Sequence, residues 1–179
     1  MAGNIHKIFL SFHSADLAYK ARFESLFHGL ITISESVDIG DIPEGIQTET
    51  VRQKIRDEYL RDTSVTIVLI GSNTWQRKHV DWEIGSSIRQ TRANPRSGLL
   101  GILLPIYSGY SSNNYNPFTI PPRLHENLEK KFASIHRWDE NPIFVQRWIH
   151  DAYIRKSLIE PDNSYPPFSN NRSGDRWSY

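Results

Sequence analysis

Short runs of apolar residues alternate along the chain with longer segments in which apolar residues recur at helical spacing. Five strand-like runs occur, at residues 7–12, within 31–39, and at 64–71, 98–107 and 132–138. The run SVTIVLIG (64–71) is apolar on both faces and rich in β-branched residues, as expected for a central strand of a parallel sheet covered by helices. The pattern therefore predicts an α/β protein.

The helical segments follow these runs and share one apolar face each. They are expected at residues 17–30, 48–60 and 142–159, and around Val80, Ile84 and Ile88, which recur at i, i+4 and i+8. The polar stretch HSAD after the first run is typical of a helix cap. Because strands and helices alternate, right-handed crossovers predict a flavodoxin-like, doubly wound, mainly parallel five-stranded sheet with strand order 2-1-3-4-5.

The length of 179 residues fits a single hydrophobic core. Residues 1–160 are predicted to form this domain. The polar, Pro-rich segment 161–179 lacks periodicity, which predicts a tail or strap without regular structure.

The predicted strand order places a ligand crevice between the first and third strands, because ligands of open α/β sheets bind where the order reverses. The first of these strands ends at Ser11, Phe12 and His13, and the third leads to Asn73. The helix that follows the third strand carries Glu83, which is therefore expected to overlook the crevice.

The pattern alone leaves a structural role open for each of these residues. A single Glu on a helix is in most proteins solvated or ion-paired, since a site requires a constellation of groups. Trp75 and Trp82 could equally be anchors of the core or of an interface, because aromatic side chains bury large apolar areas whatever the function.

Composition and motifs exclude several functional classes. No cysteine is present, and the seven His residues show no ligand spacing, so no metal site is predicted. Lys plus Arg number 21 against 20 Asp plus Glu, which gives no indication of a nucleic-acid partner. G-x-G-x-x-G and P-loop motifs are absent, and the third strand ends in GSNT rather than in a phosphoacceptor Asp. Without a signal peptide or a long apolar stretch, we expect no membrane association and a cytoplasmic location.

Three segments together resemble the Toll/interleukin-1 receptor (TIR) fold, and in particular the TIR-like proteins of the bacterial Thoeris anti-phage system. They are KIFLSFHSAD, DIGDIPEG and TSVTIVLIGSNTWQRKHVDWEI. The resemblance covers about residues 5–107, and its most specific part runs from Thr63 to Ile84. One departure is His79, because many TIR domains carry Trp four residues before the Glu; Trp75 or Trp82 would then supply the ring.

The resemblance implies that Glu83 is the catalytic residue and that NAD is the substrate, with no further cofactor. It implies that Ser11, Phe12 and His13 line the substrate pocket, and Asn73 and Trp82 are added as candidate pocket residues. Residues 39–47 resemble the BB loop, which often contacts a neighbouring protomer, so a homo-oligomer is expected.

The implied reaction cleaves the nicotinamide–ribose bond, since nicotinamide leaves from NAD without being protonated and one carboxylate can stabilise the oxocarbenium-like ribose. The family then implies a cyclic ADP-ribose isomer or a related ADP-ribose signal that activates a separate effector protein after a phage-derived trigger. Two alternatives stay open from the residues. The chain could be a TIR interaction module without turnover, or a module that senses a nucleotide in the same crevice.

Overall fold

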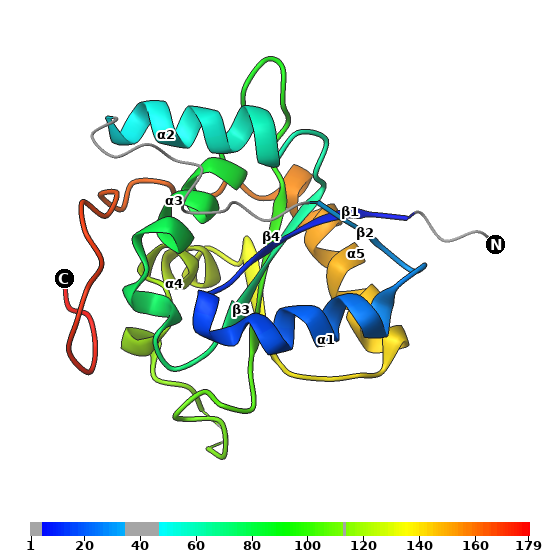
Figure 1. The fold of residues 1–179 in the computed structure, drawn as a ribbon. Coiled ribbons are helices and arrows are strands. Elements are labelled where there is room, and N and C mark those ends of the chain that lie inside the picture. The colour runs from blue at the N-terminus through cyan, green and yellow to red at the C-terminus, as the bar shows by residue number, and fades with distance from the viewer. Residues whose placement is uncertain (1–4, 35–46, 113) are drawn as a thin grey trace.

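A five-stranded parallel sheet forms the centre of the computed structural model, which describes residues 5–34, 47–112 and 114–179 (Figure 1). In spatial order its strands are β2 (Thr32–Ile33), β1 (Lys7–Ser11), β3 (Val65–Ile70), β4 (Gly98–Leu103) and β5 (Ala133–Arg137). All four neighbouring pairs are parallel. The predicted order 2-1-3-4-5 and the flavodoxin-like α/β class are confirmed.

Strand β3 is the centre of the core, and all six of its residues are buried. Its side chains alternate between the two faces, as the pleat requires. Ile67 and Leu69 belong to the apolar cluster on one face, whereas Val68 and Ile70 belong to the cluster on the other. The pairing of Ser11 with Val68 aligns β1 with β3, so both strands deliver their following loops to the same edge of the sheet.

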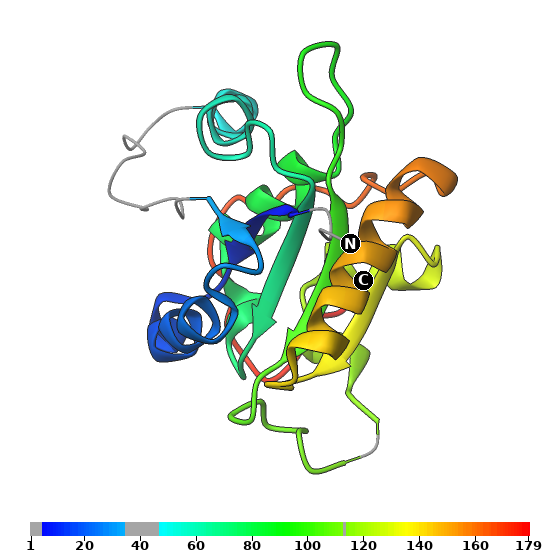
Figure 2. The same ribbon diagram turned by 90° about the vertical axis from the view of Figure 1, so that its right-hand side faces the viewer.

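Helices cover both faces of the sheet (Figures 1 and 2). They are α1 (Leu17–Phe27), α2 (Thr48–Lys54) with the π-helical turn η3 (Ile55–Tyr59), α3 (Lys78–Ser87), α4 (Pro122–Glu129) and α5 (Pro142–Leu158). Short 3-10 turns are η1 (Ser14–Asp16), η4 (Thr74–Gln76) and η5 (Pro117–Thr119). Apolar residues of α1 and α5 pack on one face, and those of α2, α3 and α4 pack on the other.

One helix differs from the prediction. Helix α4 was not predicted, although Pro122 stands at its start and Leu124 and Leu128 follow at helical spacing. Its eight residues are too few for a clear periodic signal, and packing of Leu124 against the sheet cluster stabilises it. The second strand was expected within residues 31–39, and β2 lies inside this range, where it pairs with β1 at Lys7 and Ile8.

Residues 161–179, which we call the strap, follow α5 without a helix or strand. The strap is anchored by two buried aromatic side chains, Phe168 and Trp177. The indole Nε1 of Trp177 donates a hydrogen bond to the carbonyl of Ile120 at 2.8 Å. The strap is seen beside α3 and α4 in Figure 1. The division at residue 160 stays a prediction.

No helix in the described ranges combines the length and the apolar character that crossing a membrane requires.

Candidate functional site

Glu83 lies on α3, the helix that follows the central strand β3. Val80 and Ile84 of this helix pack against the sheet, and this contact fixes the rotation of α3 about its axis. Glu83 is turned inward as a result, and its exposed fraction is 3%. A charged side chain with this burial requires a specific partner.

The partner is Ser11, the last residue of β1. Its hydroxyl donates a hydrogen bond to Oε2 of Glu83, across 72 positions of sequence. Ser11 itself is fully buried. Adjacent placement of β1 and β3 explains the contact, because the helix after β3 passes over the carboxyl end of β1. The structure thus brings together two of the residues proposed for the site.

Burial changes the ionisation of Glu83. Loss of hydration raises the pKa of its carboxyl from 4.5 to about 8, against the opposing effect of the hydrogen bond from Ser11. With this burial the carboxyl is therefore mainly protonated at neutral pH. A cation bound beside it would favour the ionised form, because opposite charges close together stabilise each other.

His79 makes a second connection between α3 and the end of β1. It lies one turn before Glu83, and its Nε2 donates to the carbonyl of Phe12 at 3.0 Å. Burial lowers the pKa of His79, which keeps the imidazole neutral, although the hydrogen bond to Phe12 opposes this shift. Phe12 is half-buried, and its side chain packs against the apolar cluster on the α1–α5 face of the sheet, so only its carbonyl faces α3. His79 therefore holds the main chain of the β1–α1 connection in place.

The two polar candidates at the sheet edge lie further out. His13 is half-buried, and its Nδ1 is 3.4 Å from the hydroxyl of Ser14. Burial, followed by the nearby charge of Arg77, lowers the pKa of His13. Asn73 is exposed at the start of η4, where its carbonyl accepts a hydrogen bond from the backbone of Gln76 at 3.1 Å.

Trp82 is used for packing. It is 8% exposed and belongs to the apolar cluster formed with Phe9 and the α2–η3 segment. Its Nε1 donates to the carbonyl of Phe168 in the strap at 2.8 Å. Successive helical residues point about 100° apart, so Trp82 and Glu83 contact different neighbours. Trp75, the other candidate ring, is also buried.

A buried carboxyl that sequence reasoning missed lies at the same edge of the sheet. A Ser or Asp of HSAD was expected to cap the following helix. Asp16 does stand at the N-cap position of α1, but neither η1 nor α1 has a side-chain cap hydrogen bond. Instead Asp16 is 5% exposed and accepts a hydrogen bond from the Thr74 hydroxyl at 3.5 Å. Burial raises the pKa of Asp16, and the hydrogen bond from Thr74 opposes the shift. Its position in HSAD directly after a strand was the available signal.

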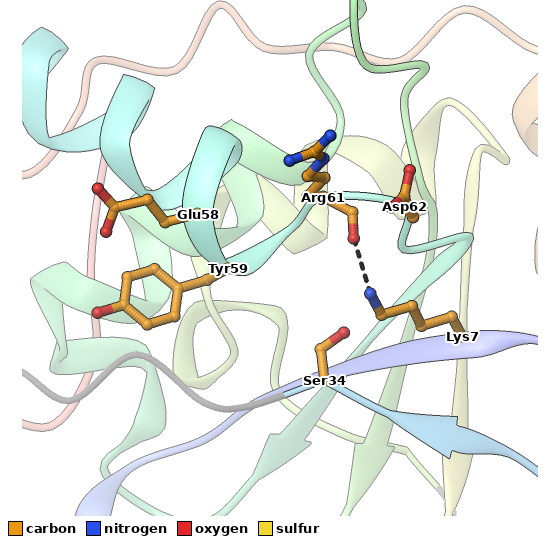
Figure 3. A pocket seen from close by; sticks show the side chains of 6 residues that line it. All are labelled: Lys7, Ser34, Glu58, Tyr59, Arg61 and Asp62. Atoms are coloured by element: carbon orange, nitrogen blue, oxygen red, sulfur yellow. Dashed lines mark hydrogen bonds between the residues drawn. The ribbon is translucent and has the colours of Figure 1, made fainter.

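Most of the segment that resembles the BB loop, residues 39–47, lies outside the described residues. A cavity of about 440 Å³ lies between the β1–β2 pair and the end of η3 (Figure 3). In it the ammonium of Lys7 donates to the carbonyl of Arg61 at 3.0 Å, and Ser34 faces the same space. Glu83 does not line this cavity. It also does not line a cavity beside the strap, which Tyr165 and Tyr179 border, or a cavity beside α1, which Tyr19 borders. Across the described residues, no group of three or more His, Cys, Asp or Glu side chains is placed to hold a metal ion.

Comparison with known proteins gives one family match. Residues 9–107, more than half of the chain, match the model of the family described as "Thoeris protein ThsB, TIR-like domain". The matched range includes the last three residues of β1 and all of β3, α3 and β4, and therefore both Ser11 and Glu83.

Among solved structures, the chain is similar to the TIR domains of "Structure of the activated Roq1 resistosome directly recognizing the pathogen effector XopQ". The two are 14% identical, the match covers 86% of this chain and 84% of that chain, and the TM-score is 0.37. No curated protein matches the chain.

Proposed function

This chain belongs to the TIR-like domain family of the Thoeris protein ThsB, and from this premise we propose that it cleaves the nicotinamide–ribose bond of NAD. The product is a cyclic ADP-ribose isomer or a related ADP-ribose signal that activates a separate effector in anti-phage defence. The observation that carries the proposal is the buried contact between Glu83 and Ser11 at the carboxyl end of β1. In a doubly wound sheet, ligands bind at this edge.

In the proposed reaction the bond between ribose C1′ and the nicotinamide nitrogen breaks, and its electron pair leaves with the nitrogen. Nicotinamide becomes neutral, and positive charge develops on the ribose ring. The Glu83 carboxylate stabilises this charge, and exclusion of water strengthens the interaction. Water or an atom of the same molecule then attacks C1′, which gives ADP-ribose or a cyclic isomer with release of a proton.

Ser11 has a specific part in this proposal. Its hydroxyl occupies a hydrogen-bonding position on the Glu83 carboxyl. A ribose hydroxyl is chemically equivalent and would bond to the same carboxyl in the bound state. The cationic nicotinamide ring would also favour the ionised form of Glu83, because burial raises the pKa of this carboxyl to about 8 when no cation is bound. Substrate binding would thus generate the carboxylate that the reaction requires.

The test compares wild type with Glu83→Gln at matched abundance, because Gln keeps the size and an acceptor for Ser11 but has no charge. We expect NAD cleavage to fall by about 10²–10³-fold, in line with removal of a main electrostatic group. Infected cells that also carry the effector should lose both the ADP-ribose product, measured by mass spectrometry, and protection from phage. Ser25→Ala, at an exposed position on α1, provides the matched control.

A second function is favoured by the low exposure of Glu83. A carboxyl that is 3% exposed and bonded to Ser11 would also serve as a structural link in a TIR interaction or nucleotide-sensing module. In that case protection persists in Glu83→Gln and no ADP-ribose product appears in either strain. That result would exclude the enzyme and leave the module as the better account.

A further inference from the structure

The strap, residues 161–179, runs antiparallel to α3 and bonds to both ends of this helix. Near the helix start, Oδ1 of Asn171 accepts from the backbone N–H of Lys78 at 3.0 Å. Near the helix end, the side-chain amide of Asn163 donates to the carbonyl of Gly85 at 2.9 Å. The family match ends at residue 107, so the strap lies outside the matched range, whereas α3 lies within it.

The first of these bonds is a helix cap provided from a distant part of the chain. The first N–H groups of any helix have no partner within the helix, and the residue before it normally supplies an acceptor. Arg77 holds this position in α3 and makes no side-chain cap hydrogen bond. Asn171, 93 positions away, supplies the acceptor to Lys78 instead. The first turn of α3 therefore depends on the strap.

A second contact holds the middle of α3 immediately before Glu83. The backbone N–H of Phe168 donates to Oδ2 of Asp81 at 3.0 Å, and its carbonyl accepts from Nε1 of Trp82 at 2.8 Å. The N–H and the carbonyl of Phe168 are thus bound by two consecutive residues of α3, Asp81 and Trp82. Asp81 is fixed further by a buried ion pair with Arg123, with Oδ1 and Nε 2.9 Å apart.

These contacts hold the helix from the strap, while Ser11 at the end of β1 and Phe12 directly after it bond to the helix from the sheet. We propose that Asn171 and Phe168 are positioning residues, which hold α3 against β1 so that the carboxyl of Glu83 stays in place beside Ser11. Loss of the Asn171 cap frays the first turn of α3, which carries His79 and its bond to Phe12. Water then reaches Glu83, and its orientation is lost.

The kinetic test of this proposal rests on the proposed function, because it measures NAD cleavage. The pKa of Glu83 provides a second measurement that does not require NAD cleavage. Three variants of the full chain are compared. Asn171→Ala removes the cap, Asn171→Asp keeps an acceptor at the same place, and Asn170→Ala changes the exposed neighbouring residue. For each variant, kcat and KM for NAD, the ¹³C NMR titration of the Glu83 carboxyl and the urea unfolding curve are measured, with Glu83→Gln to assign the resonance.

We expect Asn171→Ala to lower kcat by about fivefold with little change in KM, because this factor corresponds to the free energy that a helix cap typically contributes. Hydration of the carboxyl should lower the pKa of Glu83 from about 8 by about one pH unit. Asn171→Asp should restore both values, and Asn170→Ala should match wild type.

If the pKa of Glu83 is unchanged in Asn171→Ala, the proposal is overturned. This holds even if the free energy of unfolding falls, because the strap would then stabilise the fold without positioning Glu83. If Asn171→Asp does not restore the wild-type pKa of Glu83, the helix cap is not the cause of the shift seen in Asn171→Ala, and the proposal is overturned. If wild type does not cleave NAD, the proposed function fails, and the titration still tests whether the strap positions Glu83.

Discussion

The α-carbon of Gly71 lies against the carboxyl of Asp16, so closely that a β-carbon at position 71 would overlap with Oδ2. The contact joins the loop after β3 to the turn after β1. The Gly71 N–H also donates to the Thr74 hydroxyl at 2.9 Å, and this hydroxyl donates in turn to Asp16. The switch point of the sheet is therefore held by one buried carboxyl and a position that accepts only glycine without rearrangement.

Gly71→Ala should destabilise the protein by about 1–3 kcal/mol, because the added methyl displaces the buried carboxyl of Asp16. Thermal unfolding measures the effect. In the double variant Gly71→Ala with Asp16→Ala the overlap is absent, so the two free-energy changes should not add. Strict additivity would show that the two residues do not interact.

Glu83 should make stability fall as the pH rises. Its folded-state pKa of about 8 lies above the ordinary value of 4.5, so the folded protein binds this proton more tightly than the unfolded chain does. The resulting stabilisation is complete below pH 4.5 and is lost as the pH rises through 8. The free energy of unfolding of wild type should therefore fall relative to Glu83→Gln by up to about 1.4 kcal/mol per pH unit. Urea unfolding at pH 5, 6, 7 and 8 tests this, and parallel curves for the two proteins would contradict it.

Ser11→Ala should raise the pKa of Glu83 further, because the Ser11 hydrogen bond lowers it in wild type. If the carboxylate is the active form, the rise of kcat/KM with pH should move to higher pH. NAD cleavage measured between pH 6 and 9 reports this shift. Ser25→Ala, on the exposed face of α1, should leave the pH profile of kcat/KM unchanged. An unchanged profile in Ser11→Ala would show that the Ser11 hydroxyl does not affect the ionisation of Glu83.

Arg123→Met should destabilise the protein by about 3–5 kcal/mol, because it leaves the Asp81 carboxylate buried without its cation. Both side chains are at most 2% exposed. The second substitution Asp81→Asn, added to Arg123→Met, should recover part of the lost free energy of unfolding. Arg22→Met, which breaks an exposed ion pair with Glu140, should have little effect on the same urea unfolding curve. Equal losses in the two Arg variants would show that burial does not determine the strength of the pair.

The alternation of apolar runs and amphipathic segments was sufficient for the class and strand order of the sheet. A strand such as 64–71 has to be buried on both faces, and the spacing of Val80, Ile84 and Ile88 has to place one face of a helix on it. The same alternation located the switch point, and with it Ser11 and Glu83. Helix α4 escaped prediction because eight residues give a weak periodic signal and packing supplies most of its stability.

Only the tertiary structure decided what these residues contact. The hydrogen bond between Ser11 and Glu83 joins positions 72 residues apart, and no local pattern encodes such a distance. Burial, which sets the ionisation of Glu83, depends on everything packed around it. The same is true of Trp82, whose indole bonds to Phe168 in the strap. The sequence by itself therefore determined the sheet and the edge at which a site can form, because periodicity is local, whereas partners and pKa values arise from long-range packing.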